Sequence, residues 1–173
     1  FINLKNYFKI SERSNLFGWG FKSGKGSELL SLPNGLTFVP LICYEAIFSN
    51  FLKPSVKDAD FILQITNDAW FGKSIGPQQH LAQLRMRAIE YGLPVIRVAN
   101  TGISAIIDAE GKVVKKLSIN KSGYLDSFIP SRKHTTIYGK FGDLIFLSLV
   151  LVTLVIAFLN KKFINQKNFK TAG

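Results

Sequence analysis

The chain has 173 residues and carries 22 Lys plus Arg against 11 Asp plus Glu, a formal net charge of +11. Hydrophobic residues make up 47% and charged residues 19%, so a disordered or collagen-like chain is excluded and one domain or slightly more is expected. The single cysteine, Cys43, excludes an intrachain disulfide framework and metal sites built on several thiolates. The positive charge would suit nucleic acid or anionic lipid, but without a basic patch with interleaved aromatics we expect no nucleic-acid partner.

The first apolar segment of the chain leads directly to Cys43. The chain begins at Phe1 without the basic and apolar regions of a signal peptide, and we expect it to be the C-terminal piece of a longer protein. LTFVPLIC at 36–43 is a nearly continuous apolar run, which predicts a strand buried on both faces. Pro40 indicates a bulge or an edge position in that strand.

Helical and strand patterns alternate after Cys43. A helix is predicted over 44–53 and a buried strand over 61–66, which ends in the polar turn Asn67-Asp68. Pro77 begins the clearest helix, and Gly92 ends it as a C-cap. A third strand over 95–100 and a hairpin with its turn at 108–111 follow. Strands that alternate with helices predict an α/β fold.

A membrane-spanning helix is predicted near the C-terminus. Residues 144–159 contain no charged side chain and no polar stripe of the kind that a buried core helix would show. With their flanks they define a transmembrane helix over 138–160, which follows a globular part over 1–137 and precedes a basic tail over 161–173. The tail carries four lysines and no acid, which favours a cytoplasmic C-terminus and a globular part outside the cytoplasm.

Cys43 is the candidate nucleophile. A lone cysteine after a buried strand is usually a small buried hydrophobe. The start of a helix, however, offers free N–H groups that stabilise a thiolate and can hold the oxyanion of an acyl-transfer intermediate. Glu45 lies two residues further on, and its simplest interpretation is a first-turn acid favoured by the helix dipole.

Several further polar and aromatic residues are candidates for binding. Asn67, Trp70 and Phe71 follow a buried strand, where open α/β sheets place ligand sites; an ordinary turn and a small hydrophobic cluster are the alternatives. His80 lies in the first turn of the predicted helix and is interpreted as structural. Neither His80 nor His134 has a partner at metal-ligand spacing.

Three segments of the chain resemble one known family. LICYEAIF, NDAWFGKSIGPQQH and RAIEYGLPVIRVANTGISAIIDAEGKV, followed by an apolar helix, are similar to the C-terminal part of bacterial apolipoprotein N-acyltransferases. The resemblance implies part of a nitrilase-like αββα sandwich outside the inner membrane, followed by one C-terminal transmembrane helix in a multi-pass protein. It implies transfer of an acyl chain from a phospholipid to the N-terminal diacylglyceryl-cysteine of a lipoprotein, without a cofactor or metal.

The resemblance also assigns roles to individual residues. Cys43 would be the nucleophile that becomes a thioester, with Tyr44 and Glu45 as its supporting neighbours. The family's catalytic Glu and Lys lie upstream of the Cys, the Lys in a stretch like K-x-x-L-V-P-F-G-E. This chain contains no such stretch, so neither residue is assigned here and the fragment alone is expected to be inactive.

Two other functions are compatible with the same residues. A carbon–nitrogen hydrolase of the amidase or nitrilase type would use Cys43 on a small amide or nitrile, without a need for the apolar helix. A catalytically incomplete membrane-anchored fragment would account for the missing Glu and Lys.

Overall fold

The structure is a computed structural model that describes residues 26–170, with side chains described through Lys161. The N-terminal loop residues before residue 26 and the last residues of the basic tail lie outside the described part. The elements, in chain order, are β1 Leu30–Ser31, β2 Thr37–Ile42, η3 Cys43–Ile47, α2 Ser49–Leu52, η4 Val56–Asp58, β3 Phe61–Asn67, η5 Asp68–Phe71, α3 Gly76–Tyr91, β4 Val95–Asn100, β5 Ser104–Ile107, β6 Val113–Leu117, α4 Ile137–Phe141 and α5 Leu144–Lys170. The η elements are short 3₁₀ helices.

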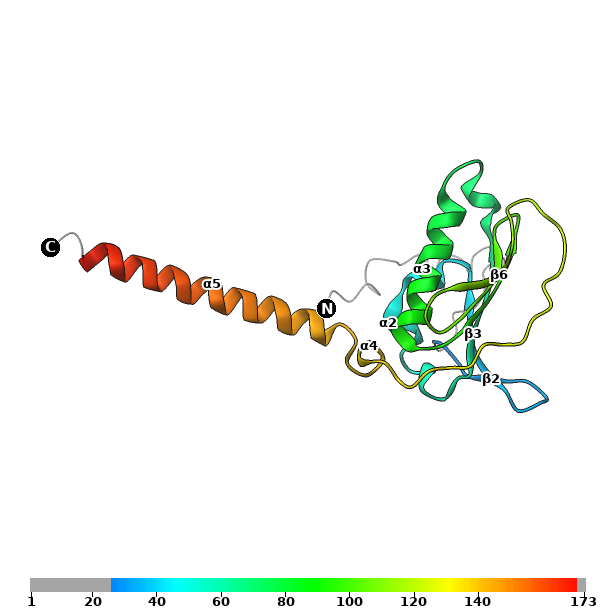
Figure 1. Cartoon of the computed structure of the whole chain (residues 1–173), viewed down its shortest axis with the longest axis horizontal. Helices are drawn as coiled ribbons and strands as arrows, with labels where there is room; N and C mark the ends of the chain where they lie inside the picture. The colour runs from blue at the N-terminus through cyan, green and yellow to red at the C-terminus, as the bar shows by residue number, and fades with distance from the viewer. Residues whose placement is uncertain (1–25, 171–173) are drawn as a thin grey trace, which may run out of the picture.

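The strands form one sheet of six in the order β1-β2-β3-β4-β5-β6, so the predicted α/β class is confirmed (Figure 1). β2, β3 and β4 are parallel to one another, and the remaining neighbours are antiparallel. The carboxyl ends of parallel strands meet at one edge of a sheet. Ile42 pairs with Ile65, and Asn67 with Asn100, so the segments that follow β2 and β3 begin side by side.

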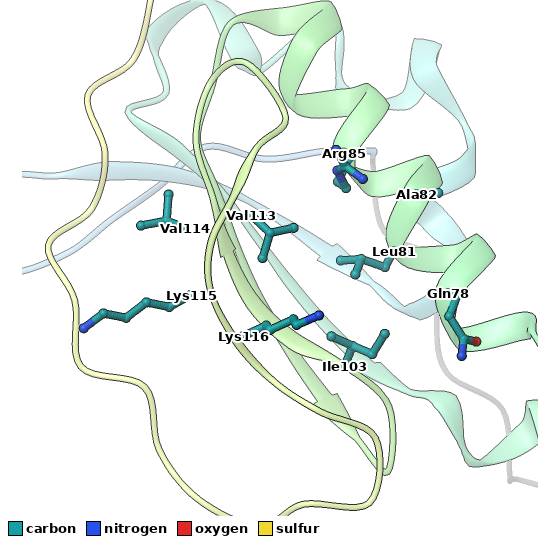
Figure 2. Close-up of a pocket in the computed structure, with 9 residues that line it drawn as sticks. All are labelled: Gln78, Leu81, Ala82, Arg85, Ile103, Val113, Val114, Lys115 and Lys116. Carbon is teal, nitrogen blue, oxygen red and sulfur yellow. The ribbon is translucent and has the colours of Figure 1, made fainter.

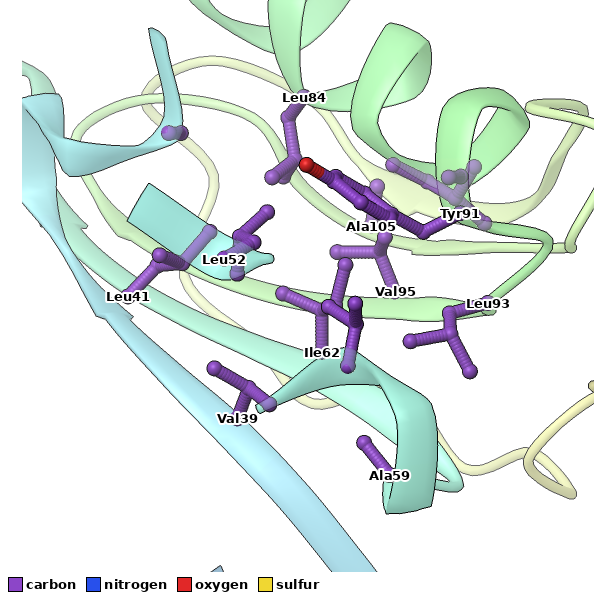
Figure 3. Close-up of a cluster of buried hydrophobic side chains, with 14 of the residues drawn as sticks. Val39, Leu41, Leu52, Ala59, Ile62, Leu84, Tyr91, Leu93, Val95 and Ala105 are labelled. Carbon is purple, nitrogen blue, oxygen red and sulfur yellow. The ribbon is translucent and has the colours of Figure 1, made fainter. Parts of the chain in front are cut away.

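The hydrophobic core lies between one face of this sheet and helix α3 (Figure 3). α3 contributes Leu84 and Ala88, which are fully buried. Alternate strand residues such as Val39, Ile62 and Val95 meet them from the sheet, as the period of two along a strand requires. α3 starts with Pro77 in its first turn and ends at Gly92, which adopts the left-handed conformation, so the predicted boundaries of this helix are confirmed.

Toward the carboxyl ends of the parallel strands, the opposite face of the sheet is apolar and open to solvent in the described part of the chain. Ile42, Ile65 and Val98 stand in register across the three parallel strands and are each more than half exposed. The prediction that β2 is buried on both faces is therefore wrong here, because no described element covers this side. Pro40 does lie at an edge, since β1 pairs only with Thr37 and Phe38 of β2.

The helix predicted over 44–53 is divided into η3 and α2. Cys43 adopts the left-handed conformation and Phe48 is extended, with φ of −91° and ψ of 97°, so the backbone leaves the helical region at both places. Apolar spacing predicts which face of a helix is buried but does not register such local interruptions.

Helix α5 is long and apolar enough to cross a membrane, and none of its side chains from Leu144 to Lys161 is buried. The stretch that we expected as one helix from 138 is divided at Gly142, which has φ of 56° and separates α4 from α5. Asp143 fastens this junction to the domain, because it accepts hydrogen bonds from Asn50 of α2 and from Tyr138 of α4, both at 2.9 Å. The proposed limits of the transmembrane, globular and tail segments remain predictions.

An arginine in the middle of α5 should prevent membrane insertion. A segment of residues 138–173 fused to a soluble reporter is expected to fractionate with membranes, and Val152→Arg should move the fusion to the soluble fraction, since a central arginine costs about 3 kcal/mol on insertion. Alkaline extraction of membranes measures the distribution, and Val152→Leu is the matched control. Equal extraction of the arginine variant and the parent would contradict a membrane-spanning α5.

Candidate active site

Cys43 lies at the carboxyl end of β2 in a backbone conformation that residues with a Cβ rarely adopt. Its φ is +52°, in the left-handed region that favours glycine. Such a conformation persists only where the surroundings enforce it, and it is concentrated at functional sites. Its side chain is half-buried and forms no disulfide.

The carbonyl oxygen of Cys43 points into a buried polar network. Gln64, on the neighbouring strand β3, donates from Nε2 to this oxygen at 2.9 Å. The Nε2 atom of His80, in the first turns of α3, lies 3.2 Å from the same oxygen and 3.1 Å from Gln64 Nε2. Gln64 and His80 are 0% and 2% exposed, so water does not compete for these contacts.

The two ring nitrogens of His80 join Asp68 to Gln64. With Nδ1 donating to Asp68 Oδ1 at 3.0 Å, Nε2 accepts the second amide proton of Gln64 at 3.1 Å, and its approach to the Cys43 oxygen is a contact without a hydrogen bond. Among the described residues, no hydrogen bond joins His80 to the Cys43 sulfur. The contact of His80 with Cys43 is therefore with its backbone carbonyl.

Arg97 of β4 anchors the network. It is 1% exposed and donates from Nε to the Ile103 carbonyl at 3.0 Å and from Nη2 to Asp68 Oδ2 at 2.6 Å. Its Nη1 donates to Gln64 Oε1. Burial lowers the pKa of the Arg97 guanidinium, and the carboxylate of Asp68 opposes that shift. The buried charge is thus paired and fully hydrogen-bonded, as a buried ion requires.

Gln64 and Arg97 were not predicted as site residues from the sequence. Each is a single polar residue inside an otherwise apolar strand, and the two pair directly across β3 and β4. A polar residue within a strand predicted to be buried indicates a buried partner, because a buried polar side chain needs a hydrogen bond. This feature could have identified both residues.

Tyr44 and Glu45 lie next to the thiol but face different ways. The carboxylate of Glu45 accepts a hydrogen bond from the Ile42 N–H at 2.7 Å, so it caps the turn that follows β2, close to its predicted first-turn role. The Tyr44 side chain is 53% exposed, and its ring centre lies 6.1 Å from that of His80. It lies beside Cys43 at the open side of the site.

Residues 67–71 form a turn and carry two aromatic side chains in different surroundings. Asn67 caps η5 by accepting a hydrogen bond from the Ala69 N–H at 3.1 Å, which is the turn role considered from the sequence. Phe71 packs edge-on against His80 with ring centres 5.7 Å apart. Trp70 is 86% exposed and belongs to no hydrophobic cluster of the described residues, so its side chain is free to contact a ligand.

The other candidate binding features of the described residues lie away from Cys43. A groove of about 520 Å³ lies between α3 and β6 and is lined by residues such as Arg85 and Lys116 (Figure 2). Within residues 26–161, no group of His, Cys, Asp and Glu side chains is arranged to hold a metal ion.

The chain was compared with known proteins. The family model described as carbon-nitrogen hydrolase matches residues 10–133. The chain is 46% identical over 150 residues to an apolipoprotein N-acyltransferase of Rickettsia bellii and 48% identical over 127 residues to one of Rhizobium rhizogenes. These alignments cover 86% and 73% of this chain but only 30% and 24% of the relatives, so the chain spans less than a third of their length.

A solved structure is similar as well. An amidase from Nesterenkonia sp. aligns with a TM-score of 0.48 and 19% identity, over 58% of this chain and 40% of the amidase.

A side chain at Gly102 should disrupt the network. A Cβ at this position would lie 2.2 Å from Asp68 Oδ2 and 2.7 Å from Asp68 Cβ, so Asp68 would have to shift away from Arg97 and His80. We expect Gly102→Ala to lower the free energy of unfolding by about 2–3 kcal/mol, as overpacking does. Denaturant unfolding measures this change.

Gly123→Ala is the control for this substitution, because a Cβ there meets only Leu117 at ordinary contact distances. A Gly102→Ala variant as stable as Gly123→Ala would show that Asp68 is not held as tightly as described.

Proposed function

Because the chain belongs to the carbon–nitrogen hydrolase family, we propose that it is the nucleophile-bearing C-terminal part of an apolipoprotein N-acyltransferase. The similarity to two enzymes of that name, at 46% and 48% identity, supports this choice within the family. The observation that carries it is the presence in one chain of Cys43 at a strand end and of α5, an exposed apolar helix of membrane length. A soluble amidase has no use for such a helix.

The proposed reaction has two steps. The Cys43 sulfur attacks the ester carbonyl of a phospholipid, the carbon–oxygen bond breaks, and the lysophospholipid oxygen leaves with the proton of the thiol. The α-amine of a diacylglyceryl-cysteine then attacks the thioester, the carbon–sulfur bond breaks, and an amide and the free thiol result. A covalent intermediate of this kind divides one difficult transfer into two easier ones.

The backbone of Cys43 suits both steps. The carbonyl and N–H of a trans peptide point in opposite directions, and the described residues contain no cis peptide. Because the Cys43 carbonyl points into the core, the N–H of Tyr44 points outward. As a first-turn N–H it has no partner within η3, so it is placed to bind the oxyanion that forms in each step.

The missing catalytic groups would come from the part of the protein outside this chain. At the carboxyl ends of the parallel strands, where Ile42 precedes Cys43, the outer face of the sheet is apolar and exposed among the described residues. We propose that the second layer of an αββα sandwich covers this face and supplies the general-base Glu and the oxyanion Lys. The fragment alone would then lack acyltransferase activity.

The remaining site residues would serve the lipid substrates. Tyr44, Trp70 and Phe71 lie on the segments that follow β2 and β3, and Glu45 and Asn67 cap the turns of those two segments. The acyl chain of the phospholipid and the acceptor lipoprotein would both reach the site from the membrane. We propose an inner-membrane location with the globular part outside the cytoplasm and the lysine-rich C-terminus inside it.

Removal of the thiol should abolish the covalent intermediate. In the full-length protein, Cys43→Ala is expected to form no acyl-enzyme when incubated with a phospholipid that carries a labelled acyl chain. The parent should form a labelled thioester that hydroxylamine cleaves. Gel detection of the label measures both, and a hydroxylamine-sensitive thioester retained by Cys43→Ala would refute the assignment.

Trp70 should contribute to lipid binding and not to stability, because its side chain is 86% exposed. Trp70→Ser is expected to raise the KM for a long-chain phospholipid about 10-fold or more, given the 1.5–3 kcal/mol of burying a large apolar side chain. The unfolding midpoint should remain within the error of the parent value. Steady-state kinetics with long- and short-chain donors checks this, and Trp70→Phe is the conservative control.

An unchanged KM in Trp70→Ser for both chain lengths would argue against lipid contact at this residue. Release of ammonia from short amides by the full-length protein, without acyl transfer from phospholipid, would favour the carbon–nitrogen hydrolase alternative.

A further inference from the structure

We propose that Gln64 and His80 are positioning residues that orient the Cys43–Tyr44 peptide, so that its N–H faces the oxyanion of an acyl-transfer intermediate. This inference rests on the proposed acyl-transfer chemistry but not on the identity of the acyl donor. It assigns a role to two buried side chains that touch neither the sulfur nor a substrate.

The carbonyl end of this peptide group is held from the core. Its oxygen accepts a hydrogen bond from Gln64 Nε2 at 2.9 Å, and the same amide group is held by His80 Nε2 at 3.1 Å, so His80 acts on the peptide through Gln64. Rotation of the peptide about its flanking bonds would break the bond from Gln64 and bury an unpaired amide. The left-handed conformation of Cys43, which its Cβ disfavours, is therefore held from the carbonyl side.

The second argument concerns the orientation of the Gln64 amide. Arg97 donates from Nη1 to its Oε1, so the oxygen must face the guanidinium and the NH₂ group must face Cys43. A flipped amide would place its NH₂ group against the Arg97 donor and its oxygen against the Cys43 carbonyl oxygen. Arg97 thus determines which end of Gln64 reaches the nucleophile.

The third argument concerns the orientation of the His80 ring. Asp68 Oδ1 accepts from Nδ1 at 3.0 Å, and Asp68 Oδ2 is held by Arg97 at 2.6 Å. The ring is therefore fixed with Nε2 toward Gln64 and the Cys43 carbonyl. Phe71 packs edge-on against the same ring, which limits its sideways movement.

The two reactions of a thiol separate this role from a purely structural one. Attack on an ester carbonyl forms an oxyanion that needs the Tyr44 N–H, whereas alkylation by iodoacetamide forms none. Replacing a side chain that only maintains the fold or the reactivity of the thiol would slow both reactions alike. A side chain that orients the peptide would affect acylation alone.

The test uses the full-length protein and the burst of p-nitrophenolate from a p-nitrophenyl acyl ester. In that burst the Cys43 sulfur forms a thioester and p-nitrophenolate leaves. Gln64→Glu is nearly isosteric and keeps an oxygen toward Arg97, but it replaces the donor to Cys43 by an acceptor. We expect its burst rate to fall about 100-fold, as with the loss of an oxyanion contact, and its alkylation rate to change less than about threefold.

His80 is tested by a pair of substitutions. His80→Asn keeps an amide near Asp68 but has no atom at the Nε2 position, and it should show the same selective loss. His80→Gln reaches that position and should recover a large part of the burst rate. Arg85→Gln is the control on the same helix, because Arg85 lines the groove away from the site and bonds to Gly111 (Figure 2).

The outcomes are distinct. Burst and alkylation rates that fall in parallel in Gln64→Glu and His80→Asn, or a burst rate that does not change, would overturn the positioning role. If the parent protein accepts the p-nitrophenyl ester but forms no thioester from phospholipid, the proposed acyltransferase function fails. The positioning role would still be decided by the variants in that case.

Discussion

The burial of the Arg97 charge is the constraint on which the arrangement around Cys43 depends. A guanidinium that is 1% exposed must satisfy its donors inside the protein, because an unpaired buried charge is very costly. Three acceptors meet this need: the Ile103 carbonyl, Gln64 and Asp68. Two of these acceptors also hold other parts of the site. Gln64 donates to the Cys43 carbonyl, and Asp68 Oδ1 bonds to His80 Nδ1. The buried guanidinium thus fixes the orientation of Gln64, and Gln64 in turn holds the backbone carbonyl of Cys43.

Helix α3 connects this site with the apolar helix α5. Near its start, His80 contacts the Cys43 carbonyl; at its end, the Tyr91 hydroxyl donates to the Ser49 carbonyl, and its ring packs edge-on against Tyr138 of α4. The segment after Cys43 is held at the same place, because Asn50 bonds to Asp143 at the start of α5. The nucleophile and the apolar helix are thus tied to one another through short contacts along one layer of the domain.

The sequence was informative where local chemistry determines structure. Pro77 and Gly92 mark the ends of α3 because a missing N–H and a left-handed C-cap act locally, and Pro40 marks the strand edge for the same reason. The division of the helix predicted over 44–53 could not be predicted from apolar spacing, because it lies at Phe48, whose backbone is extended. The covering of the sheet was also misjudged, since apolar strands do not show which part of a protein covers them.

Individual residues of the candidate site were predicted, but the hydrogen bonds that connect them were not. Cys43 lies at the strand end where the sequence predicts it, and its role as nucleophile stays a prediction. His80 was interpreted as structural, and the sequence did not show that it contacts the Cys43 carbonyl. The link between them runs through Gln64 and Arg97, whose pairing is set by the register of two strands. Register depends on the tertiary fold, and periodicity in one sequence does not specify it.

The distribution of the network along the chain has a consequence for biosynthesis. Cys43 emerges from the ribosome first, Gln64 and His80 follow with β3 and α3, and Arg97 arrives only with β4. Until β4 has paired, nothing orients the Gln64 amide, and the nascent chain carries an ordinary cysteine in a relaxed backbone. The left-handed geometry at Cys43 is therefore a product of completed folding, since its buried partners come from strands and a helix that follow it in the chain.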